Sequence, residues 1–149
     1  MKPSYILRLR AAEFGSTAAC LGEQIAAVVM LVGRLRANLV WYLADVEGVG
    51  PALAERTSQP TLFGDSFRLA TAAAAVSQFQ RGVFVGVPKG IASPQFRNGG
   101  LWTEDDDDAD LGDAVVEIRA FDTTYVLVAT IAAEVAEAVT QAFSIRRAV

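Results

Sequence analysis

An apolar stripe with helical spacing, near the start of the chain, most constrains what this protein can fold into. Its five members follow one another at intervals of four, three, four and three residues: Leu21, Ile25, Val28, Val32 and Leu35. At about 100° per residue, these side chains occupy an arc of about 80° on one face of a helix. The pattern predicts a helix over 16–36 with Ser16 as its N-cap. An end near Val29 is the alternative, because adjacent β-branched residues lower helix propensity.

Strand-like segments on both sides of this helix predict an α/β fold. The expected order is a strand at 6–10, the helix at 16–36, a strand at 39–46, a helix at 65–80, a strand at 83–87, an irregular connection at 88–113, a hairpin of 114–121 and 125–129, and a last helix from Thr130. Right-handed crossovers would make the first three strands parallel. We therefore predict a mixed five-stranded sheet with three helices, in the order β-α-β-α-β-loop-β-β-α.

Several boundary residues follow from local chemistry. Asp65 or Ser66 is expected to begin the second helix, and Gly82 is expected to end it. Residues 54–64 are rich in Thr, Ser, Gln and Pro and are expected to form a loop. The third helix is expected to start at Thr130 and to end before Arg146, where a cation suits the negative end of a helix.

Length and composition indicate one domain, residues 1–149. The single cysteine indicates a reducing compartment. Apolar residues make up 52% of the chain and charged residues 20%, which excludes a disordered tail. The run from Ile25 to Gly33 is far shorter than the roughly 20 residues of a membrane span. Arg8 and Arg10 interrupt any signal-peptide core, and Cys20 has no second cysteine to pair with. We expect a cytoplasmic protein that does not enter membranes.

Charge is concentrated in the irregular connection. Seven of the 17 acidic residues lie between Glu104 and Asp113, whereas the rest of the chain carries 13 basic and 10 acidic residues. Like charges in a block repel one another and stay solvated. We therefore expect a mobile loop whose neutralisation would leave the domain equally or more stable. Nucleic acid is not an expected partner, because the basic residues form no cluster.

The sequence offers few groups for catalysis, and we expect no enzyme. The chain has no histidine, no nucleophile elbow and no glycine-rich phosphate loop. Asp45 and Glu47 leave the second strand two residues apart and, with Asp122, are the alternative: a carboxylate site for a metal, for acid–base chemistry or for a small ligand. The spacing of Asp106, Asp108 and Asp110 resembles a calcium loop but lacks the glycine that such a loop needs. No catalytic, metal or cofactor site is predicted.

The acidic connection is instead the expected contact surface. An aromatic anchor beside carboxylates suits recognition of a basic protein, and the predicted contact residues are Trp102, Glu104, Asp105, Asp106, Asp107, Asp108 and Asp110. In character, though not by any motif, this profile is similar to small acidic inhibitors of nucleases and other toxins, the immunity and antitoxin proteins. A second alternative is a structural subunit that self-associates through an Ala-rich helix face, so that the chain is a monomer or a homodimer.

Overall fold

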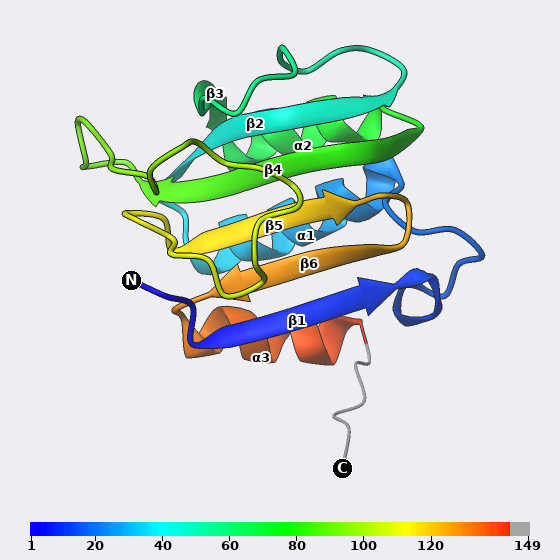
Figure 1. Ribbon diagram of the computed structural model, residues 1–149. Coiled ribbons are helices and arrows are strands. Elements are labelled where there is room, and N and C mark those ends of the chain that lie inside the picture. Colours follow the sequence, from blue (N-terminus) through cyan, green and yellow to red (C-terminus); the bar gives the residue numbers. More distant parts are fainter. Residues whose placement is uncertain (144–149) are drawn as a thin grey trace.

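Six strands form one antiparallel sheet, with three α-helices on one of its faces (Figure 1). The computed structural model describes residues 1–143. Its elements are β1 (Tyr5–Arg10), the 3-10 helix η1 (Ala11–Phe14), α1 (Gly22–Leu35), β2 (Leu39–Val49), β3 (Thr61–Asp65), α2 (Ser66–Ala74), β4 (Gln78–Pro88), β5 (Val116–Phe121), β6 (Tyr125–Thr130) and α3 (Ala133–Ala142). The strands lie in the order β1-β6-β5-β4-β2-β3.

The α/β class and the three helices are as predicted, but the sheet has six strands and not five. The strand that was missed is β3, a short edge strand inside the segment expected to be a loop. Its presence also explains why the predicted parallel arrangement is wrong. Four antiparallel steps separate β1 from β2, so these two strands do run in the same direction. The chain then reverses once more at β3, and β4 returns antiparallel to β2.

The helices are shorter than their patterns predict. Helix α1 begins after Leu21 and not after Ser16, because the Gln24 side chain accepts a hydrogen bond from the Leu21 backbone N–H and so caps the first turn. It continues to Leu35, past the alternative end at Val29. Asp65 caps α2 as expected, accepting from the Arg68 backbone N–H at 2.7 Å.

Two further helix boundaries differ from prediction. Gly82 does not end α2 but lies inside β4, where a Cβ atom would stand 2.7 Å from the Phe84 ring. The third helix is capped at Ala132, while the Thr130 hydroxyl accepts from the Ala132 backbone N–H just before it. The predicted hairpin is confirmed: β5 and β6 pair through a turn at Asp122 and Thr123, both with positive φ. Arg146 lies outside the described residues.

Both faces of the sheet are covered, which explains why its central strands are apolar on both sides. In β2, Trp41 and Leu43 face the helices. Val40 and Tyr42 face the opposite layer, which is the long connection between β4 and β5. We call this connection, residues 89–115, the strap. In Figure 1 it crosses in front of the sheet, while the helices lie behind. No helix within residues 1–143 has the length and apolar character that crossing a bilayer demands.

Candidate functional site

The strap is an ordered layer of the protein and not the mobile loop that its charge predicts. Leu101 and Leu111 are 1% and 2% exposed and pack against the sheet beside Val85 and Leu127. The backbone N–H of Leu101 donates to the Ser58 carbonyl at 2.8 Å. Apolar burial therefore fixes the strap to the sheet, and this backbone hydrogen bond fixes it to the loop between β2 and β3.

Beneath the strap lies a buried network of charged side chains. Glu117 and Arg119 stand two residues apart on β5, so both point to the strap side of the sheet, and each is at most 2% exposed. Arg97 reaches down from the strap and donates to both carboxylate oxygens of Glu117, at 2.7 and 3.1 Å. Arg119 donates upward to the backbone carbonyls of Asp105 and Asp106. The network joins the strap to the sheet from both sides.

Arg97 is the central cation of this network. Its Nε donates to the Asp105 carboxylate at 2.9 Å, and its Nη1 donates to the Asp110 carbonyl at 3.0 Å. Burial by itself lowers the pKa of Arg97, but its hydrogen bonds to Glu117 and the negative charges of Glu117 and Asp105 outweigh burial and raise the pKa above its usual value. The side chain therefore connects two points of the strap to β5 while remaining charged.

Basic residues from other elements pair with most of the acidic run. Arg8 on β1 binds Asp107, Arg81 on β4 binds Glu104, and Lys2 binds Asp108 at 3.4 Å. The expectation that the acidic residues only repel one another is therefore wrong, because the fold brings cations that are distant in sequence to the strap. The Asp110 pKa is lowered, first by the hydrogen bond from the Gly112 backbone N–H and then by the nearby terminal amino group.

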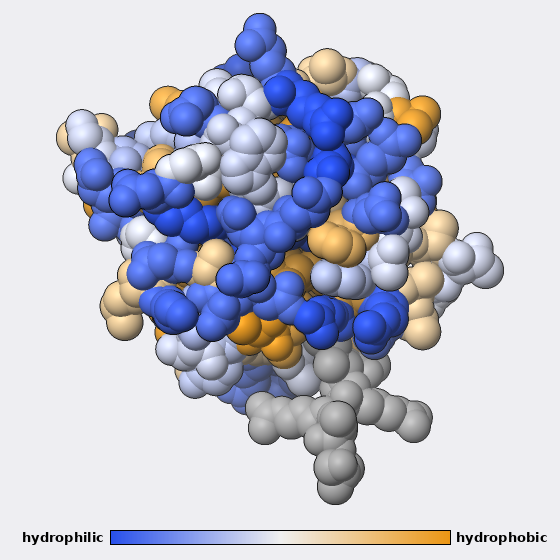
Figure 2. Space-filling view, viewed as in Figure 1, coloured by the Kyte–Doolittle hydropathy of each residue, from blue (hydrophilic) through white to orange (hydrophobic). Residues whose placement is uncertain are grey.

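Exposure alternates along the acidic part of the strap. Side chains turned toward the sheet, such as Thr103 and Leu111, are buried, and Asp105 and Asp107 are partly buried. Those turned outward are exposed: Trp102, Glu104, Asp106, Asp108 and Asp110. We call these five the outward row. Figure 2, which looks onto this face, shows hydrophilic side chains over most of it. The seven predicted contact residues are thus divided into five that face solvent and two that mainly hold the strap.

Trp102 is the large apolar side chain of the outward row, and local hydrogen bonds fix its position. Its indole Nε1 donates to the Gly99 carbonyl at 3.2 Å, and its backbone N–H donates to the Asp105 carboxylate at 3.0 Å. Gly100, with φ of 87°, permits the turn before it, since a Cβ atom there would stand 2.6 Å from the Ser58 carbonyl oxygen. Even so, Trp102 is 45% exposed.

The alternative site at Asp45 and Glu47 is occupied by cations of the protein itself. Asp45 is fully buried, accepts from the Thr103 backbone N–H at 3.0 Å, and lies 3.7 Å from Arg81. Arg56 pairs with Asp45 at 3.5 Å and with Glu47 at 3.2 Å. This arrangement holds the middle of the strap, at Thr103, and the loop after β2 against the sheet. Asp122 lies in the β5–β6 turn and lines a small pocket with Arg81 and Thr103, two partners of Asp45.

No group of three or more His, Cys, Asp or Glu side chains in residues 1–143 is arranged to hold a metal ion. The buried network of Arg97, Glu117 and Arg119 was missed by sequence reasoning, which assigned no buried role to these residues. The available signal was their opposite charge two residues apart on one strand. These two charges are buried because the strap forms a third layer over the sheet, and sequence periodicity did not reveal that layer.

Comparison of the chain with known protein families, with curated proteins and with solved structures finds no match.

Proposed function

We propose that this protein is a non-catalytic binding protein of the inhibitor type, which engages a basic protein partner through the outward row. The observation that carries the proposal is the alternation of exposure along the strap. It places an exposed tryptophan in line with four exposed carboxylates on a segment that is clamped from beneath. The sequence concentrates the charge, and the fold turns four of these carboxylates outward.

Trp102 is suited to be the apolar anchor of such a contact. Tryptophan is enriched among the residues that dominate binding energy, because it buries a large area and has few rotatable bonds. The hydrogen bond from its indole Nε1 to Gly99 already restrains this side chain in the free protein, and the bond from its backbone N–H to Asp105 restrains the backbone. Little conformational entropy is therefore lost when a partner covers it.

The outward carboxylates supply attraction that a basic partner can use. Within residues 1–143, Asp106 forms no ion pair, and its neighbours Glu104 and Asp108 form pairs whose carboxylates are 64% and 59% exposed. Exposed ion pairs of this kind contribute only about 0–1 kcal/mol, so a partner's cations replace or extend them at little loss. A row of one sign also accelerates encounter with an oppositely charged surface.

The experiment compares three immobilised forms of the protein as baits for basic proteins from the source cells. The outward variant carries Glu104→Gln, Asp106→Asn and Asp108→Asn, while Asp110 is kept because it caps Gly112. The control variant removes three exposed carboxylates elsewhere in the molecule: Glu23→Gln, Glu55→Gln and Glu137→Gln. Both variants change the net charge by the same amount, so they differ only in where the charge is lost.

The wild-type and control baits should retain the same basic partner, and added salt should release it. The outward variant should bind this partner more slowly and with a flatter dependence on salt, since charge steers association. Equal recovery and equal salt sensitivity for all three baits would contradict the proposal. So would a partner that is acidic or neutral.

A further inference from the structure

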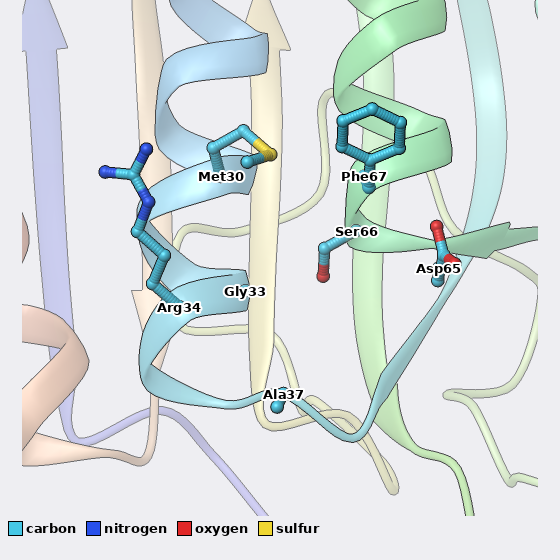
Figure 3. A pocket seen from close by; sticks show the side chains of 7 residues that line it. All are labelled: Met30, Gly33, Arg34, Ala37, Asp65, Ser66 and Phe67. Atoms are coloured by element: carbon cyan, nitrogen blue, oxygen red, sulfur yellow. The ribbon is translucent and has the colours of Figure 1, made fainter.

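The helix face, on the side of the sheet opposite the strap, carries an apolar groove. The groove runs between α1 and α2, and its floor consists of small side chains, among them Ala26, Ala27 and Ala70. Met30 borders it on the α1 side and Phe67 on the α2 side, as Figure 3 shows for one end of the groove. The groove belongs to no part of the proposed partner site.

Glycines let α1 and α2 approach each other closely. At one end, a Cβ atom on Gly22 would stand 1.9 Å from the Val76 carbonyl oxygen, and at the other, one on Gly33 would stand 2.5 Å from the Ser66 Cβ. These contacts show that α1 and α2 run antiparallel and pack with close backbone approach. Because the residues along the outer edges of the two helices are small, the apolar groove between them stays open.

Phe67 lies beside the groove and does not fill it. Its side chain is 70% exposed, more than any other large apolar residue of the described chain except Met1. An aromatic ring left in water beside an open apolar surface lacks the stabilisation that its burial would bring. The same face therefore carries both the projecting Phe67 ring and the apolar groove of small residues.

The charges at the groove are complementary to each other. Arg34 lies at the α1 side and Asp65 at the α2 side, flanking the groove on opposite sides (Figure 3). Arg34 makes no ion pair within residues 1–143, and Asp65 uses one carboxylate oxygen to cap α2. When two such surfaces face each other across a two-fold axis, the cation of each copy meets the anion of the other. A partner with a strong charge of one sign would instead be repelled by either Arg34 or Asp65.

We infer that a second copy of this chain covers the groove, forming a two-fold symmetric dimer. A two-fold axis that runs along the groove places α1 of each copy over α2 of the other. Phe67 of each copy then enters the groove of the other copy, and Arg34 of each copy faces Asp65 of the other. Such an isologous contact uses one patch twice, as two-fold dimers require. Because the helices and the strap cover opposite faces of the sheet, both outward rows stay accessible in the dimer (Figure 1).

Sedimentation velocity over about 1–100 µM tests the dimer directly. Wild type should sediment as a dimer that dissociates on dilution, and Phe67→Glu should weaken the dimer at least about tenfold. Val49→Glu is the matched control, since it adds the same charge at a residue that is 55% exposed at the end of β2. Val49→Glu should leave the dimer unchanged.

A charge exchange tests the predicted contact itself. Arg34→Asp and Asp65→Arg should each weaken the homodimer, because each brings like charges together twice. Mixed in equal amounts, the two variants should form a heterodimer as stable as the wild-type dimer, since both opposite-charge contacts are then restored. A circular-dichroism spectrum of each variant separates loss of contact from loss of fold. A wild-type monomer at all concentrations, a dimer indifferent to Phe67→Glu, or a mixture that stays monomeric while both variants remain folded would overturn the inference.

Discussion

Replacing Arg97 with Met should reduce the free energy of unfolding by about 3 kcal/mol. Arg97 is 12% exposed and Glu117 is fully buried, so the substitution removes one partner of a buried ion pair. Such a loss generally costs about 3–5 kcal/mol, because the remaining charge stays uncompensated. The lower end applies here, since Arg119 still binds Glu117 at 2.5 Å. Met keeps the apolar stem and isolates the effect of the charge.

Urea unfolding followed by circular dichroism measures this loss, and Arg8→Met is the control. Arg8 also pairs with the strap, through Asp107, but the two side chains are 47% and 30% exposed. Its removal should reduce the free energy of unfolding by less than about 1 kcal/mol. The slope against urea should be similar for both variants, so the midpoints can be compared directly.

A double-mutant cycle then assigns the loss to the pair. On a Glu117→Gln background, Arg97→Met should cost at least about 1 kcal/mol less than on the wild-type background. Equal losses for Arg97→Met and Arg8→Met, or strict additivity of Arg97→Met and Glu117→Gln, would refute the reasoning that this buried pair fastens the strap.

Four further outcomes follow from the structure. Trypsin should cut native protein after exposed Lys89 before it cuts after Arg97, and early cleavage at Arg97 on gel analysis would contradict a clamped strap. Burial raises the pKa of Cys20 to about 11, so native thiol labelling at about pH 8 should be no faster than unfolding. The folded pKa exceeds the unfolded one, so urea titrations should show stability falling as pH rises from about 9 toward 11, a loss that Cys20→Ala should reduce. Mg²⁺ should leave the thermal midpoint unchanged in wild type and in Asp45→Asn, whereas a rise in wild type alone would restore the metal-site alternative for Asp45 and Glu47.

Elements with strong periodicity could be predicted from the sequence, while their ends and the sheet order could not. The α1 stripe and the hairpin around Asp122 are local patterns that tertiary contacts only reinforce. The start of α1 depended on the side chain of Gln24, which competes with the more usual cap Ser16. The short strand β3 was lost among turn-forming residues, and missing this one reversal changed the predicted direction of β4.

The acidic run could be identified from the sequence, but its physical state could not. The charge count identified the acidic run, yet its pairing partners Arg8, Arg81 and Arg119 are distant along the chain, so no local pattern connects them to it. Leu101 and Leu111 lacked periodicity because they anchor an irregular layer instead of a helix or strand. The charge was therefore interpreted as a sign of mobility, whereas the fold uses part of it to attach the strap to the sheet.

The most direct test of the account is the dissociation rate of the basic partner from Trp102→Ala. A lost aromatic anchor of about 2 kcal/mol should raise this rate roughly 30-fold and leave the association rate nearly unchanged. Neutralising Glu104, Asp106 and Asp108 should instead slow association, so the two variants separate anchoring from steering. Both rates can be measured by following binding of the partner to the immobilised protein over a range of salt concentrations. A dissociation rate that Trp102→Ala does not change, with the partner still bound, would show that the outward row is not the contact surface.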